Sequence, residues 1–125
     1  MTIEPGLRHT STMTVTDDDT AIRLGSGDMA VLATPRMCAL MENAAMSAVA
    51  SLLPDGSTTV GGNIAVSHLR PTAVGATVEA TAVLDKVDGR KLYFTVRATQ
   101  NGGDVIGEGT HLRFIVDRQR FMSKL

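Results

Sequence analysis

A carboxylate and an imidazole stand where the neighbouring sequence is apolar, and such a pair is suited to acid–base chemistry. Glu42 lies on the flank of an apolar helical stripe, and His68 is predicted to share a strand face with Ile64 and Val66. A carboxylate in apolar surroundings shifts its pKa upward or requires partners, and histidine carries protons near neutral pH. Two plainer interpretations stay open, namely a solvated acid on the helix edge and a histidine satisfied within the core.

A threonine at the predicted start of the helix adds a hydroxyl to this set. Thr34 precedes Pro35, which is the arrangement expected of a helix cap followed by the first helical residue. A hydroxyl at this point also lies in the positive end of the helix dipole, where a developing oxyanion is stabilised. Threonine can act as a nucleophile when a base is adjacent. Thr34 is therefore both a predicted cap and a candidate catalytic residue.

Two further features indicate substrate binding. Arg113 is predicted to share a face of the last strand with His111 and Ile115. An inward charge on a sheet is costly unless it is paired, so we expect Arg113 to meet a carboxylate, unless this face is open to solvent. Gly61 and Gly62 lie inside a predicted strand, where glycine indicates a bulge or the close approach of another group. A free backbone N–H at this point could donate to a substrate carbonyl, and Gly61, Gly62 and Arg113 are the candidate substrate-binding residues.

A long amphipathic helix over residues 35–53 must position several of these groups. Its apolar positions follow the 3, 4, 7, 8 spacing of a buried stripe. They are Met37, Leu40, Met41, Ala44, Ala45, Ala48, Val49 and Leu52. The sequence Pro54-Asp55-Gly56 ends the helix.

The hydrophobic period changes to two on both sides of this helix, which predicts strands. The predicted strands cover residues 8–16, 58–70, 78–84, 92–98 and 105–116. On the second of them, one face is expected to carry Val60, Gly62, Ile64, Val66 and His68. Residues 17–30 show no sustained period and are interpreted as a loop that could cover a site.

One strand, one long helix and four consecutive antiparallel strands cannot form a parallel βαβ sheet. The economical arrangement is an α+β fold in which an antiparallel sheet of about five strands wraps around one central helix. This is the hotdog architecture, in which two protomers usually pair their sheets and the sites lie at the protomer interface. We expect residues 1–125 to form a single domain of this kind.

Composition narrows the functional classes. A net charge of −1 gives no electrostatic attraction to nucleic acid or to an anionic membrane. No apolar run approaches the roughly 20 residues of a membrane span, and the N-terminus lacks a signal-peptide core, so we expect a cytoplasmic protein. The three histidines have no metal-ligand spacing, and the single cysteine, Cys38, is best interpreted as a small hydrophobe. With only four aromatic residues (three Phe, one Tyr), the core is small, and further burial in a homodimer is expected.

From about residue 32 to residue 121 the chain resembles the fluoroacetyl-CoA thioesterase branch of the hotdog superfamily. The resemblance is carried by LATPRMCALMENAA, GGNIAVSHLRPTAVG, VDGRKLYFTV and IGEGTHLRF. It implies a hotdog dimer that hydrolyses acyl-CoA thioesters. The spacing of Thr34, Glu42 and His68 matches the family's catalytic triad without a gap, Arg113 matches its site arginine, and Gly61 matches a backbone donor.

One segment departs from the family pattern. The fluoroacetyl-specific enzyme has phenylalanines ahead of the catalytic threonine, where they form a gate over the substrate. The corresponding segment here, LGSGDMAVLA, contains no phenylalanine. The resemblance therefore implies thioester chemistry but not fluoroacetyl selectivity.

The resulting hypothesis is hydrolysis of a short or medium acyl-CoA to the free acid and CoA. The residues do not decide between attack by Thr34, attack by Glu42 and activation of water. CoA enters as part of the substrate, with no separate cofactor and no metal. The expected partner is a second copy of the chain, and dimers can pair further into tetramers. Two alternatives are an acyl-CoA binder with little turnover and an enoyl-CoA hydratase, whose Asp-to-His motif is not present here.

Overall fold

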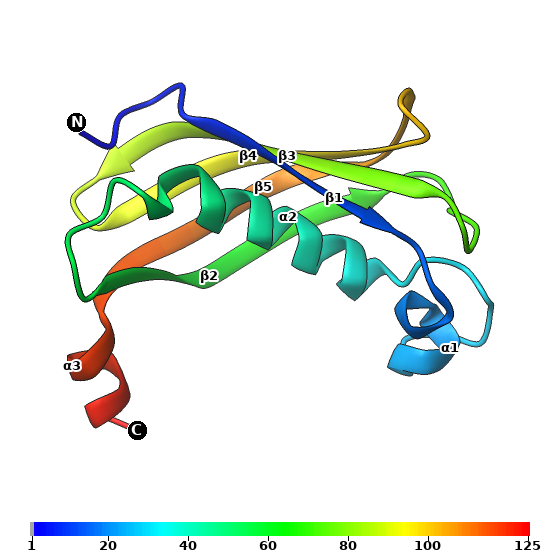
Figure 1. Ribbon diagram of the computed structural model, residues 1–125, viewed down its shortest axis with the longest axis horizontal. Helices are drawn as coiled ribbons and strands as arrows, with labels where there is room; N and C mark the ends of the chain where they lie inside the picture. Colours follow the sequence, from blue (N-terminus) through cyan, green and yellow to red (C-terminus); the bar gives the residue numbers. More distant parts are fainter. Residues whose placement is uncertain (1) are drawn as a thin grey trace.

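A curved, five-stranded antiparallel sheet crosses one long helix in the computed structural model, which describes residues 2–125 (Figure 1). The elements, in chain order, are β1 (Arg8–Thr14), η1 (Asp17–Asp19), α1 (Ala21–Leu24), α2 (Thr34–Ala50), β2 (Ser57–His68), β3 (Thr77–Asp88), β4 (Lys91–Gln100), β5 (Asp104–Asp117) and α3 (Arg118–Ser123). The strand order is β1-β3-β4-β5-β2, and every pairing is antiparallel. The predicted α+β architecture is confirmed, and β1 and β2 are its two edges.

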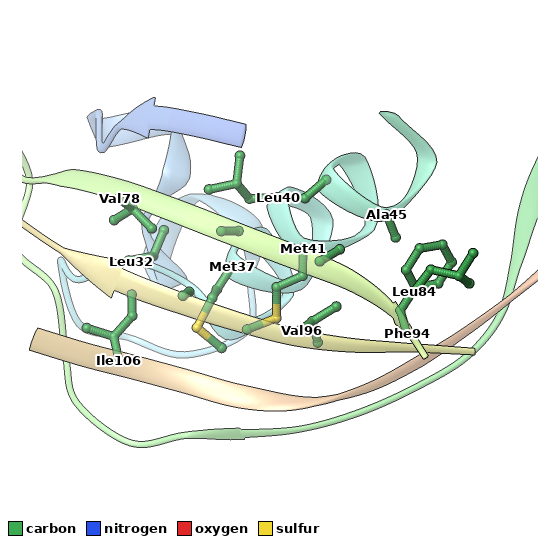
Figure 2. Close-up of a cluster of buried hydrophobic side chains, with 14 of the residues drawn as sticks. Leu32, Met37, Leu40, Met41, Ala45, Val78, Leu84, Phe94, Val96 and Ile106 are labelled. Carbon is green, nitrogen blue, oxygen red and sulfur yellow. The ribbon is translucent and has the colours of Figure 1, made fainter. Parts of the chain in front are cut away.

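The core lies between α2 and the concave face of the sheet (Figure 2). Six positions of the predicted helical stripe are buried, namely Met37, Leu40, Met41, Ala44, Ala45 and Val49. They meet the alternating buried residues of β3 and β4, which are Val78, Ala80, Ala82, Leu84, Leu92, Phe94, Val96 and Ala98. Full burial of one large apolar side chain contributes about 1.5–3 kcal/mol, so this shared layer is what fixes α2 against the sheet.

The start of α2 differs by one residue from the sequence prediction. Ala33, with an extended backbone, is the N-cap; Thr34 is the first helical residue and Pro35 the second. No side chain caps the helix, so the prediction of Thr34 as a capping residue is wrong. The hydroxyl is thereby available to another partner. The helix also ends earlier than predicted, at Ala50.

A β-bulge interrupts β2 at the glycine pair. Gly61 pairs with Arg113 and Asn63 pairs with Leu112, so Gly62 is the extra residue. The bulge reverses the alternation, because an inserted residue turns the following side chains to the opposite face. Gly61 rather than Gly62 lies on the helix side, where Ile64 also lies, and the predicted common face for all five β2 residues is wrong at Val60 and Gly62.

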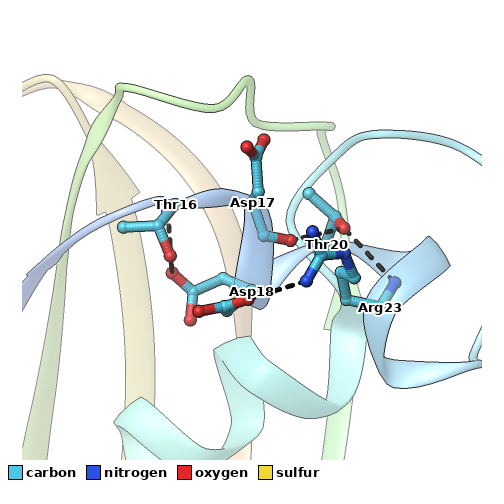
Figure 3. A network of polar contacts seen from close by, with 6 residues as sticks. Thr16, Asp17, Asp18, Thr20 and Arg23 are labelled. Atoms are coloured by element: carbon cyan, nitrogen blue, oxygen red, sulfur yellow. Dashed lines mark hydrogen bonds and ion pairs between the residues drawn. The ribbon is translucent and has the colours of Figure 1, made fainter.

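Residues 17–30 contain two short helices, η1 and α1, rather than the uninterrupted loop that was predicted. Figure 3 shows the polar contacts that build this segment: Thr16 donates to Asp19, Arg23 pairs with Asp18, and Thr20 accepts from the backbone of Arg23. Isolated bridges join Thr20 to Leu32 and Val31 to Ala73. The segment is therefore fastened to the chain just before α2.

A last short helix, α3, follows β5 and was not predicted. None of the helices formed by residues 2–125 has the length and hydrophobicity that a membrane-spanning segment needs.

Candidate functional site

The start of α2 and the end of β2 bring two of the predicted residues into direct contact. Thr34 Oγ1 lies 2.7 Å from His68 Nδ1. Thr34 is in the first turn of α2. His68 is the last residue of β2 and pairs with Gly107 of β5. The hydroxyl that does not cap the helix is thus hydrogen-bonded to a base.

The surroundings of His68 favour the neutral form of its ring. Burial of the ring lowers the pKa of His68 below its ordinary value of 6.5, and the backbone of Arg70 opposes this effect only in part. The other ring nitrogen, Nε2, is buried and has no hydrogen-bond partner among residues 2–125. A buried polar atom without a partner is uncommon in native proteins and indicates a ligand, a water or a partner chain.

A groove of about 520 Å³ opens beside this pair. Its lining is mostly apolar, with a few polar groups. The lining residues are Ala21, Ser26, Val31, Leu32, Thr34, Pro35, His68, Leu69, Arg70 and Pro71. A mainly apolar groove with two convergent polar groups is the usual form of a small-molecule site. Ala21 and Ser26, from the segment containing α1, form part of one wall.

A second group of polar side chains meets at Gly61. A methyl group placed on Gly61 would lie 2.9 Å from Glu42 Oε2, 3.4 Å from His111 Cε1 and 3.5 Å from Arg113 Nη1. Glu42 is half-buried, whereas His111 and Arg113 are almost fully buried. A side chain at Gly61 would therefore require the Glu42 carboxylate to move, whereas the contacts with His111 and Arg113 would be ordinary.

Arg113 is held by Thr59 rather than by a carboxylate. Its Nε donates to Thr59 Oγ1 at 2.8 Å and its Nη2 donates to the Thr59 carbonyl at 2.9 Å. Within residues 2–125 no carboxylate lies within ion-pair distance of the guanidinium, so the expected direct contact is not present. Burial lowers the pKa of Arg113, and the charge of Glu42 opposes this effect. Glu42 is therefore the nearby counter-charge without being a hydrogen-bond partner.

The predicted site residues thus fall into two places within one protomer. Thr34 and His68 are together, and Glu42 is with Gly61 and Arg113; no hydrogen bond joins Glu42 to His68 in the part of the chain that is described.

Gly62 does not join either group. A methyl group on Gly62 would meet the ring of Phe114, at the face of the sheet away from α2. Because of the bulge, Gly62 faces away from the residues around Gly61, and its part in substrate binding stays a prediction.

Sequence reasoning assigned no role at the site to Thr59 or His111. It did place His111 on the strand face of Arg113, because the two residues are two positions apart. Thr59 gave no signal of its own, since a threonine in a strand is ordinary. Cys38 behaves as the sequence suggested: burial and the charge of Glu42 raise the pKa of its thiol, which disfavours a thiolate.

Residues 15–119 match the family model described as fluoroacetyl-CoA-specific thioesterase. The chain belongs to this family. The fluoroacetyl-CoA thioesterase of Streptantibioticus cattleyicolor is 41% identical over 95 residues, which cover 76% of this chain and 68% of that protein. The predicted family is therefore confirmed.

Solved structures of thioesterases agree with this membership. A crystal structure of the fluoroacetyl-CoA thioesterase has a TM-score of 0.90 and 35% identity, covering 98% of this chain and 94% of that one. A mutant of the same enzyme, with a TM-score of 0.89, was solved in complex with fluoroacetate and CoA. A thioesterase superfamily member from Thermus thermophilus has a TM-score of 0.90 and 26% identity, covering 98% and 90% of the two chains. The hotdog fold and the assignment to acyl-CoA thioesterases are confirmed.

Proposed function

We propose that this member of the thioesterase family hydrolyses short or medium acyl-CoA thioesters to the free acid and CoA, at a site made by Thr34, His68 and Glu42. The observation that carries the proposal is the 2.7 Å contact between Thr34 Oγ1 and His68 Nδ1 in the wall of the groove. A hydroxyl bonded to a neutral imidazole at a helix N-terminus is an arrangement suited to acyl transfer.

Hydrolysis through this pair has two routes. In one, Thr34 Oγ1 attacks the thioester carbonyl while His68 Nδ1 takes its proton, CoA leaves as the thiol, and water then cleaves the acyl-threonine. In the other, His68 or Glu42 takes a proton from water, which attacks the carbonyl directly while Thr34 donates a hydrogen bond. Both routes pass through a tetrahedral oxyanion, which the start of α2 and the Gly61 backbone would stabilise.

A two-fold dimer through the free edge of β2 would unite the two groups of residues. β2 is an edge strand of 12 residues, and a long unpaired edge favours pairing with another chain. In one register, antiparallel pairing of two β2 strands would bring His68 of one protomer opposite Gly61 of its partner. Because Glu42 and Arg113 surround Gly61, the partner would supply both to the Thr34–His68 pair.

The requirement that His68 lie opposite Gly61 of the partner fixes the register of this pairing. Gly62 is the extra residue of the bulge and is not counted. Pairing His68 with the partner's Gly61 then places Ala65 opposite its own copy, on the two-fold axis. Side chains opposite each other in this register lie on the same face of the joined sheet, as antiparallel pairing requires.

The proposed function also includes a domain organisation, an oligomeric state, a cellular location and the absence of a cofactor. The chain acts as one domain, as a homodimer that can pair into tetramers, in the cytoplasm. CoA enters only as part of the substrate, and no metal or separate cofactor takes part. Fluoroacetyl selectivity is not included, because the segment that lines the groove ahead of Thr34 has no phenylalanine.

The test is a panel of acyl-CoA substrates of increasing chain length, followed by release of free thiol. We expect turnover for short or medium chains and a loss of about 10² or more in kcat for Glu42→Gln and for His68→Ala. The matched control is Glu108→Gln, which makes the same chemical change on an exposed part of β5 and is expected to keep the parent rate.

Two results would contradict the proposal. One is tight binding of acyl-CoA without thiol release, which indicates a binding protein. The other is a change in enoyl absorbance without thiol release, which indicates a hydratase.

A further inference from the structure

His111 makes two hydrogen bonds that together fix its protonation state. Its Nδ1 lies 2.7 Å from the carbonyl oxygen of Asn63, and a carbonyl can only accept, so Nδ1 must carry a proton. Its Nε2 lies 3.2 Å from Arg113 Nη1, and a guanidinium can only donate, so Nε2 must be bare. An imidazolium would carry protons on both nitrogens and could not accept from Arg113.

We infer that His111 is a positioning residue: as a neutral imidazole with its proton on Nδ1, it holds the glycine bulge of β2 and orients Arg113 beside Glu42. The inference rests on the proposed function, because the bulge and Arg113 contribute to hydrolysis only if the thioester binds between them and the Thr34–His68 pair.

The first contact ties His111 to the bulge. Asn63 follows Gly62, the extra residue, at the point where the ladder between β2 and β5 shifts its register. Bulges disrupt the ladder locally, so a side-chain donor to the Asn63 carbonyl restrains the backbone there. The Gly61 N–H lies two residues earlier, and its direction depends on the same short segment.

The second contact ties His111 to the guanidinium. Nε and Nη2 of Arg113 are bound by Thr59, which leaves Nη1 for His111. Nη1 also lies near Gly61, on the side where Glu42 Oε2 approaches. Loss of the bond to Nε2 would free Nη1 to turn toward Glu42, and the carboxylate would change its position relative to Gly61.

The charged groups that face His111 come from two elements. Arg113 lies on the same strand, and Glu42 reaches it from α2; the neighbouring ring on β4 is Phe94, which carries no charge. Burial lowers the pKa of His111, the Asn63 hydrogen bond and Glu42 raise it, and Arg113 lowers it, with a net decrease. The environment therefore favours the neutral ring that the two hydrogen bonds require.

The first experiment reads the tautomer directly and needs no activity. Ring nitrogens of the ¹⁵N-labelled full-length protein are recorded by NMR from about pH 8 to about pH 6.5, the ordinary histidine range, and the spectrum of His111→Gln identifies the His111 signals. We expect a protonated Nδ1 and a bare Nε2 across this range. A proton on Nε2, in either the other tautomer or the imidazolium, would overturn the inference.

The second experiment separates positioning from packing. His111→Gln can donate its amide to Asn63 and accept from Arg113 through its amide oxygen, whereas His111→Phe fills the space and makes neither bond. We expect His111→Phe to lower kcat by about 10- to 100-fold with a smaller effect on KM, and His111→Gln to restore most of the loss. Equal kcat values for the two variants would contradict the inference. If the parent protein releases no thiol from any acyl-CoA, the proposed function fails, while the NMR result still decides the protonation of His111.

Discussion

Thr34 and His68 are separated by 34 residues, yet the threonine hydroxyl and Nδ1 of the imidazole are in hydrogen-bond contact at 2.7 Å. In the neutral ring whose Nδ1 accepts from Thr34, the proton lies on Nε2. That nitrogen is buried and unpartnered within residues 2–125. In this tautomer the imidazole accepts from the hydroxyl on one side and carries a donor without an acceptor on the other.

Removal of the hydroxyl at position 34 distinguishes the two routes of hydrolysis. If Thr34 is the nucleophile, Thr34→Ala should lower kcat by about 10² or more, Thr34→Ser should retain much of the rate, and an initial burst of thiol should mark the acyl-enzyme. If water attacks directly, Thr34→Ala should lose only the contribution of one hydrogen bond, and no burst should occur. Stopped-flow measurement of thiol release separates these outcomes.

The pH dependence follows from the direction of the His68 shift. His68 must be neutral to take a proton, and burial lowers its pKa from 6.5. We therefore expect kcat/KM to be constant around neutral pH and to fall only below pH 6.5, with a midpoint lower than that of an exposed histidine. A midpoint above 6.5 would show that another group controls the acid side.

Stability should change in the same pH range. His68 and His111 bind protons less readily in the folded protein than in the unfolded chain, because folding lowers both pKa values. The unfolded chain therefore takes up more protons as the pH falls below about 6.5, and the free energy of unfolding decreases there. Thermal melts at closely spaced pH values measure this decrease, and substitution of either histidine by Gln should reduce it.

Addition of one methyl group at Gly61 should move Glu42. The new Cβ would lie 2.9 Å from Glu42 Oε2, which is too close, so we expect Gly61→Ala to displace the carboxylate and lower kcat by about 10-fold or more. Gly103→Ala is the matched control, because a methyl group there has no neighbour within 4 Å. Equal rates for the two variants would indicate that the position of Glu42 is unimportant for turnover.

A cysteine at position 65 tests the dimer and its register. If Ala65 lies opposite its own copy, the two Cα atoms are about 4.5–5.5 Å apart, which is within disulfide range, and Ala65→Cys should form a covalent dimer under mild oxidation. Ser67→Cys is the control: two positions along β2 it would lie roughly 13 Å from its own copy. Non-reducing electrophoresis gives the result. A cross-link at 67 but not at 65 would exclude this register.

The elements that carry the core were predictable because their periods are uninterrupted. The stripe of Met37, Met41 and Val49 and the alternation around Phe94 and Val96 each continue over many residues, and the structure buries all of them. The helix and the strands bury these residues in one shared layer, and few other arrangements of the elements would bury both patterns.

The sequence predictions are wrong where a single residue changes the alternation of a strand or the start of a helix. Gly62 adds one position to β2, which turns Val60 to the other face, and no periodicity analysis reveals which of two adjacent glycines is the extra one. Thr34 was assigned as the cap because its residue type fits, whereas the backbone places Ala33 there. Glu42 was recognised as unusual, but its neighbours His111 and Arg113 come from a strand about seventy residues later. Contacts of this kind depend on how strands far apart in the sequence are aligned. Residue types alone do not specify that alignment.

The ion pair between Arg36 Nε and Asp19 Oδ1, at 2.9 Å, joins the helix that bears Thr34 to the segment that walls the groove. Past this joint the chain continues into α1, where Ala21 lines the groove and Ile22 and Leu24 are exposed. A substitution at Ala21 or Ser26 would reshape this wall without disturbing the buried layer beneath α2. The architecture thus allows the lining of the groove to change while the contact between Thr34 and His68 is kept.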